Sequence, residues 1–179
     1  MLVQLPTSQG TLAPLDLIPS PQTAPALGPF SRIAYAAAHV VAHPPQGLPF
    51  ASRTDEIDWD ATLRFRHHLW DLGFGIAEAM DTAQREILGW ETSAHLLDLT
   101  LRAAAQRPGG LAQAGVIGGA GTDSLAAAQP TLTQIVDAYV AQAETIHALG
   151  GRAILFPTAL LPRHYPEPRY YVEVYRAVS

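Results

Sequence analysis

Residues 114–158 contain one complete repeat of strand, loop, helix and strand. An apolar run at Ala114–Gly119 ends in a turn rich in Gly, Thr and Asp, and a long amphipathic helix is expected from Thr131. Gly150 and Gly151 end that helix, and a second apolar run follows at Arg152–Thr158. This order is typical of a βαβ crossover between parallel strands. Because parallel-sheet folds place their chemistry where strands run into loops, the loops after these two runs are the expected functional region.

The remaining sequence predicts further elements of the same kind. In order, they are a hairpin of Leu2–Leu5 and Thr11–Leu17, a Pro-rich connector at Pro19–Pro29, a strand at Arg32–Ala42 that could also be helical, a helix capped by Asp58 and ended by Gly73, a strand at Phe74–Met80, a helical turn at Asp81–Leu88, a helix from about Glu91 to Gln106, and a last helix after the loop Ala159–Glu167.

These elements predict an α/β fold: four parallel βα units, half of a TIM barrel, preceded by an N-terminal β-hairpin. Residues 1–30 would form the hairpin and connector, and residues 31–179 the incomplete barrel. A full barrel of eight units needs about 250 residues. Because parallel strands are normally buried on both faces, we expect a homo-oligomer or completion by a missing C-terminal half.

The composition excludes several classes of function. The chain is 48% hydrophobic and has a formal charge of −5, so it lacks the basic surface that nucleic acid requires. We also expect no membrane span and a cytoplasmic location. All 11 basic residues are Arg, and Cys is absent. Without Lys, no side chain can form a Schiff base with a carbonyl substrate.

Three carboxylates are expected near the carboxyl ends of the second and third parallel strands: Glu78, Asp81 and Asp123. They could act as general acids and bases at the barrel mouth. Alternatively, the two Asp residues cap the helices that follow. No cofactor is expected, but a divalent metal ion held by Glu78, Asp123 and His164 is the alternative.

Two further positions are candidates for the same mouth. His39 follows the first strand, and either a catalytic or a hydrogen-bonded structural role fits it. An extended chain separates it from His43 by about 13 Å, too far for one zinc ion. Tyr165, in the loop after the fourth strand, could reach a substrate or cover the core.

The Gly-rich turn after the third strand has two interpretations. Gly118, Gly119 and Gly121 could form an anion-binding nest with Thr122. They could also simply make room inside a tight ring of strands. The spacing does not match a dinucleotide fingerprint or a P-loop.

The run Val116-Ile117-Gly118-Gly119-Ala120-Gly121-Thr122-Asp123-Ser124 resembles the third-strand segment of the dihydrodipicolinate synthase/N-acetylneuraminate lyase superfamily. The segments Ala36–Val41 and Glu78–Gln84 more closely resemble a dihydrodipicolinate-synthase-related branch of it. The similarity covers roughly residues 32–179, as the N-terminal half of that barrel.

The resemblance implies aldolase or lyase chemistry on a small oxo acid or related carbonyl compound. The family's imine-forming Lys and its assisting Tyr lie on later strands, so this chain is expected to be incomplete or inactive by itself. The substrate-binding residues expected at this mouth are Thr82, which keeps the family's residue type, and Gly119, Gly121, Thr122, Thr158 and Tyr165. The alternatives are a metal-dependent barrel enzyme and a non-catalytic half-barrel that self-associates.

Overall fold

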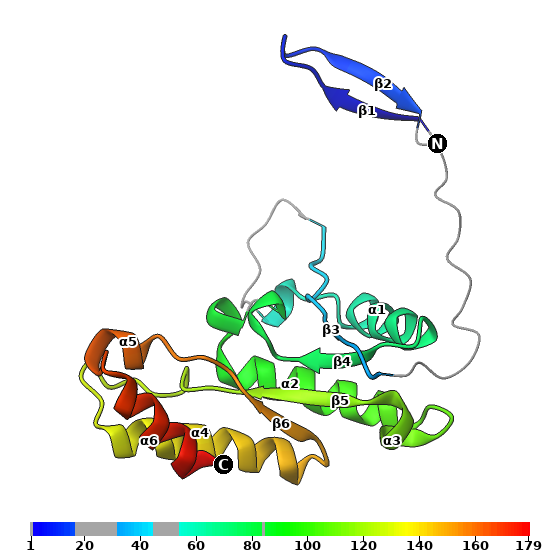
Figure 1. Ribbon diagram of the computed structural model, residues 1–179. Coiled ribbons are helices and arrows are strands. Elements are labelled where there is room, and N and C mark those ends of the chain that lie inside the picture. Colours follow the sequence, from blue (N-terminus) through cyan, green and yellow to red (C-terminus); the bar gives the residue numbers. More distant parts are fainter. Residues whose placement is uncertain (1, 17–31, 45–53, 84) are drawn as a thin grey trace.

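The computed structural model of this protein describes residues 2–16, 32–44, 54–83 and 85–179. The predicted hairpin is present as the antiparallel pair β1 (Leu2–Pro6) and β2 (Leu12–Asp16). Four parallel strands form the main sheet (Figure 1). They are β3 (Tyr35–Ala37), β4 (Gly75–Glu78), β5 (Val116–Ala120) and β6 (Arg152–Leu155). The helical segments are η1 (Thr54–Glu56), α1 (Trp59–Asp71), η2 (Asp81–Ala83), α2 (Arg85–Ala105), α3 (Gly110–Ala114), α4 (Leu132–Ala148), α5 (Leu160–His164) and α6 (Pro168–Val178).

The strand order of the main sheet is β3-β4-β5-β6, so each strand pairs with the next one along the chain. The connections from β4 onward carry α2 with α3 and then α4, while α1 lies between β3 and β4. Sequential parallel strands alternating with helices are the arrangement of half a βα barrel. The predicted fold class is therefore confirmed.

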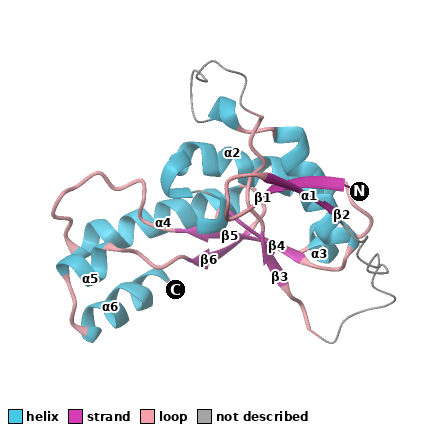
Figure 2. Cartoon of the chain, turned by 90° about the horizontal axis from the view of Figure 1, so that it is seen from above, coloured by secondary structure: helices cyan, strands magenta, loops and turns pink. Residues whose placement is uncertain are grey.

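The main helices cover one face of the main sheet. Figure 2 shows α1, α2 and α4 on the same side of the strands. Ile76 of β4 and Val116 of β5 are paired in register and pack against Trp70 and Leu101 from these helices. Side chains alternate along a strand, so every second residue points away from the helices. On β6, Ala153 packs on the helix side, and Ile154 points to the opposite face, where it is 40% exposed.

Capping residues explain where two of the helices begin. The Asp58 carboxylate accepts a hydrogen bond of 2.8 Å from the backbone N–H of Ala61, at the start of α1. Thr131 and Gln134 form a capping box at the start of α4, each side chain paired with the other residue's backbone N–H. Both interactions satisfy N–H groups that have no partner within the helix. The predicted cap at Asp58 and the predicted start of the helix at Thr131 are confirmed.

The first parallel strand is shorter than predicted: β3 has three residues, whereas the sequence predicted Arg32–Ala42. Beyond it, the backbone N–H of Val41 donates to the Thr62 hydroxyl over 2.9 Å, and Ala42 forms an isolated antiparallel bridge with Ile57. These contacts draw the backbone away from β4, which ends the parallel pairing.

The predicted helical turn before Glu91 and the predicted helix after it are both present within α2, where the non-helical Gly89, with a φ of 77°, separates them. Two short helices differ from the prediction. The helix α3 precedes the predicted strand and overlaps it at Ala114, and α5 occupies residues predicted as a loop. Each has five residues, too few to show a helical period in the sequence. In α5, a single side chain, Leu161, is fully buried against α4 and α6.

The C-terminal helix α6 closes the described part of the fold against α4. Val174 of α6 is fully buried together with Ile135 and Tyr139 of α4. Tyr171, Tyr175 and Val178 pack around the same cluster. The predicted Pro-rich connector falls outside the described residues.

Candidate functional site at the carboxyl ends of the strands

Arg85, the first residue of α2, ties together the carboxyl ends of β4 and β5. Its side chain is 1% exposed. Nη1 donates to the backbone oxygens of Ala79, over 2.9 Å, and of Gly119. Nη2 donates to Asp123 Oδ1 over 2.7 Å and to the Gln142 amide oxygen, and Nε donates to the same Oδ1 over 3.1 Å. All five guanidinium N–H groups are therefore used within the protein.

Aromatic rings enclose the same guanidinium. Its carbon lies 5.0 Å from the centroid of the Trp90 ring and 5.8 Å from that of Phe156. Such contacts stabilise a cation that has left water. Arg85 is thus a buried structural cation that positions its neighbours, and it has no donor left for a substrate.

Asp123 is the acidic partner of Arg85 and stands at the end of β5. Its Oδ1 also accepts a hydrogen bond of 3.0 Å from the side-chain amide of Gln142. Burial by itself would raise the pKa of Asp123, but the hydrogen bonds from Arg85 and Gln142 and the Arg85 charge outweigh burial and lower it. The side chain keeps 24% exposure. It is therefore an ionised, oriented acceptor that a small molecule can reach.

A pair of hydroxyls joins the ends of β5 and β6 beside this carboxylate. The oxygens of Thr122 and Thr158 are 2.5 Å apart, and either can be the donor. Thr158 also accepts a hydrogen bond of 3.1 Å from the backbone N–H of Leu160. Thr122 is 7% exposed. Because one hydrogen lies between the two oxygens, the pair keeps one further O–H that can donate elsewhere.

The structure favours the packing interpretation of the Gly-rich turn. A Cβ added at Gly119 would lie 2.9 Å from the Ala79 oxygen and 3.2 Å from Nη1 of Arg85. The backbone N–H of Gly121 already donates to Gln142 over 2.6 Å. These glycines therefore give the guanidinium room to approach the backbone, and Gly121 has no free N–H for an anion nest.

Glu78 is placed differently from what the sequence predicted. Its side chain is fully buried and faces the helices, where Arg66 Nε and Nη2 each donate to it over 2.9 Å. The Thr100 hydroxyl adds a third hydrogen bond of 2.7 Å. This carboxylate is enclosed and is not open at the mouth, where a catalytic role had been predicted for it. Its role is to pair with a buried cation.

The remaining predicted residues do not gather around Asp123. His39 is exposed, with Nδ1 2.8 Å from the backbone oxygen of Val40 and its ring against Phe65. The Tyr165 hydroxyl donates to the Pro130 backbone oxygen over 2.9 Å, and its ring packs in the core. Tyr165 therefore covers the core rather than a substrate.

The other acidic and polar candidates stay at the periphery. Asp81 is exposed at the start of η2, and Thr82 lies in η2 with its side chain outside the described part of the chain. His164 is half-buried at the end of α5. The part of the chain that the structure describes contains no group of three His, Cys, Asp or Glu residues able to hold a metal ion. The alternative metal set of Glu78, Asp123 and His164 is therefore not assembled.

Three important residues were missed in the sequence, although two left a signal there. Gln142 of α4 interrupts an otherwise apolar stripe that includes Tyr139 and Ile146. Arg66 stands four residues before Trp70 on the buried face of α1. A polar residue on a buried stripe needs a buried partner, and this rule would have indicated both. Arg85 follows a short turn and left no comparable signal.

Comparison with known families identifies the chain. Residues 3–179 match the family model described as "Protein of unknown function (DUF993)", and the chain belongs to that family. The comparison with curated proteins gives no match. Among the described residues, none of the helices combines the length and apolar character that crossing a membrane requires.

Proposed function

We propose that this protein is an aldolase- or lyase-type barrel protein, similar to the dihydrodipicolinate synthase/N-acetylneuraminate lyase superfamily, that acts on a small oxo acid or related carbonyl compound. The substrate would bind at the carboxyl ends of β5 and β6. The observation that carries the proposal is the ionised Asp123 carboxylate beside the Thr122–Thr158 hydroxyl pair. This location is where α/β barrels hold their active sites.

The polar groups at this site complement a hydroxyl and a carbonyl on one small molecule. Asp123, with its lowered pKa, accepts a hydrogen bond from a substrate hydroxyl and is a weak base. The remaining O–H of the Thr122–Thr158 pair donates to a carbonyl or carboxylate oxygen. Arg85 keeps Asp123 in one orientation, which reduces the entropy lost on binding.

The proposed carbon–carbon bond chemistry also needs an electron sink. In lyases of this type a Lys forms an imine with the substrate carbonyl, and Lys is absent from these 179 residues. The chain by itself is therefore proposed to bind the carbonyl compound without turning it over. A catalytic lysine would come from polypeptide outside this sequence.

Binding of hydroxypyruvate, which carries both a hydroxyl and a carbonyl, tests this proposal when followed by NMR of ¹⁵N-labelled protein. We expect saturable shifts of the backbone N–H signals of Thr122 and Asp123, and at least fivefold weaker binding for Thr122→Val. Asp98→Asn is the matched control, because Asp98 pairs with Arg102 on the surface of α2. Equal binding by Thr122→Val and the native chain would contradict the proposed site.

Borohydride treatment in the presence of pyruvate tests the missing lysine separately. An imine would be reduced to a stable adduct that mass spectrometry detects. We expect no adduct on any side chain. An adduct on a side chain of this chain would overturn the proposal that the chain cannot catalyse the reaction alone.

A second candidate function is self-association as a non-catalytic half-barrel. The observation in its favour is the sheet face opposite α1, α2 and α4, where Ile154 is 40% exposed and Ala37 of β3 is also exposed (Figure 2). Parallel sheets are normally covered on both faces. A second copy of the chain would cover this one.

A further inference from the structure

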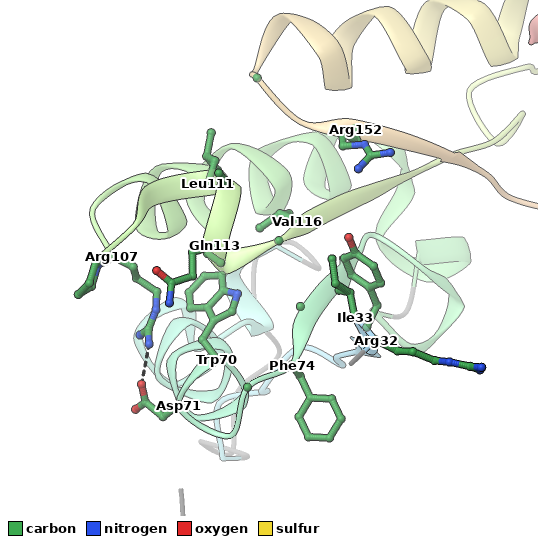
Figure 3. A pocket seen from close by; sticks show the side chains of 18 residues that line it. Arg32, Ile33, Trp70, Asp71, Phe74, Arg107, Leu111, Gln113, Val116 and Arg152 are labelled. Carbon is green, nitrogen blue, oxygen red and sulfur yellow. Dashed lines mark hydrogen bonds and ion pairs between the residues drawn. The ribbon is translucent and has the colours of Figure 1, made fainter. Parts of the chain in front are cut away.

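A large hollow lies at the end of the main sheet opposite the candidate site. Its volume is about 840 Å³. The starts of all four parallel strands contribute to its lining: Tyr35, Gly75, Val116 and Arg152. Figure 3 shows this amino-end hollow with the side chains around it. Nothing in the proposed function uses it.

Trp70, at the end of α1, brings an unsatisfied donor to this hollow. The residue is 6% exposed, and its Nε1 has no hydrogen-bond partner in the described part of the chain. In Figure 3 the nitrogen edge of the indole points toward the interior of the hollow, near Val116. A buried N–H without a partner is unfavourable. The nitrogen itself is covered from water, but the Trp70 ring lines the hollow, so its N–H signal reports on what occupies that space.

The lining is positively charged, in contrast to the net charge of the whole chain. Arg32, Arg107 and Arg152 line the hollow together with one acid, Asp71. Arg107 already has partners within the chain: its Nη2 pairs with Asp71 over 2.7 Å, and its guanidinium lies 5.3 Å from the Trp70 ring centroid. Arg152 has no ion-pair partner among the described residues. It lies across the hollow from Trp70, while Arg32 extends outward from the mouth (Figure 3).

Apolar groups form the rest of the surface. Ile33 is 75% exposed and Phe74 is 39% exposed at the mouth. The Tyr35 ring lies so close to Gly75 that an added Cβ would be 2.7 Å from two ring carbons. The hollow therefore offers exposed apolar area next to an unpaired guanidinium.

We propose that the amino-end hollow is a binding site for a small organic anion with an apolar or aromatic part. Arg152 pairs with the anionic group, a carboxylate or a phosphate. The apolar part covers Phe74 and Ile33 and lies against the Trp70 ring. The site is distinct from the carboxyl-end site and does not depend on the proposed lyase function.

NMR of the indole N–H groups tests this directly, because the chain has three Trp residues and each gives one signal. Trp70→Phe assigns the Trp70 signal; if that variant does not fold, Trp59→Phe and Trp90→Phe assign it by elimination. Benzoate and phenyl phosphate are the probes, and benzylamine is the control with the same ring and the opposite charge. We expect either anion, or both, to shift the Trp70 signal saturably, with no effect of benzylamine.

Arg152→Gln supplies the second measurement. Loss of the charge-assisted hydrogen bond is expected to weaken anion binding about tenfold. Arg102→Gln is the matched control, because Arg102 is 73% exposed on α2, outside the hollow, and binding should be unchanged. An unshifted Trp70 signal with both anions, an equal response to benzylamine, or unweakened binding in Arg152→Gln would each overturn the proposal.

Discussion

The guanidinium of Arg66 donates two hydrogen bonds of 2.9 Å to the carboxylate of Glu78, and both side chains are fully buried. The pair joins α1 to the carboxyl end of β4. Nη1 of Arg66 also donates to the backbone oxygen of His39 over 2.8 Å, beyond the end of β3. One buried cation therefore connects the first two strands of the main sheet to the helix between them.

Removing one partner of this pair should strongly destabilise the protein. Glu78→Ala leaves the Arg66 charge buried without a counter-charge, and such changes cost about 3–5 kcal/mol. Urea unfolding followed by circular dichroism measures the free energy. The matched control is Asp98→Ala, which breaks the exposed pair with Arg102 and should cost less than about 1 kcal/mol.

The double variant Arg66→Met/Glu78→Met separates charge burial from packing. Because replacing a buried ion pair by apolar side chains is often close to neutral, this variant should be more stable than Glu78→Ala. If the double variant were the less stable of the two, the Arg66–Glu78 interaction itself would be strongly stabilising.

The stability that Asp123 contributes should depend on pH. Its pKa is lower in the folded protein than the value of about 3.9 in unfolded chains, so its contribution is complete above that value. The contribution is lost as the pH falls through the folded pKa. The difference in unfolding free energy between the native chain and Asp123→Asn should therefore shrink below about pH 4. A constant difference from pH 7 to pH 3 would contradict the lowered pKa.

Thr131→Ala tests the start of α4. The change removes the hydroxyl that accepts a hydrogen bond from the Gln134 backbone N–H, and loss of such a cap costs about 1 kcal/mol. Thermal unfolding of Thr133→Ala is the control. Thr133 is exposed in the first turn of α4, and Ala has a higher helix propensity than Thr. The Thr133→Ala variant should therefore be at least as stable as the native chain.

Ile154→Arg tests the exposed face of the main sheet. If copies of the chain associate through this face, a buried charge would oppose association and the mass measured by light scattering should fall to that of a monomer. Val172→Arg is the control, because Val172 is 49% exposed on α6. A native chain that is already monomeric at all concentrations would count against the half-barrel candidate.

Much of the fold could be predicted because its signals are local. The cap at Asp58, the capping box at Thr131 and the glycines at the helix ends each act within a few residues. The apolar runs of β4 and β5 are equally direct, since buried parallel strands are apolar on both faces. The length of β3 could not be predicted, because the bridge from Ala42 to Ile57 that ends it joins separate segments.

The candidate site was predictable only in part. Asp123, Thr122 and Thr158 were expected at strand ends, and the structure places them at those ends. Glu78 was expected at the same edge, but side chains alternate along a strand and this one points to the helices. Only its register with the neighbouring strands reveals that direction.

The sequence by itself determined the order of strands and helices and the absence of an imine-forming lysine, because both follow from residue types and their local spacing. Only the tertiary structure decided which acids meet a cation. Arg66 and Glu78 are 12 residues apart, and Arg85 and Asp123 are 38 apart. Such pairs depend on how helices lie across strands, and no local pattern encodes that geometry.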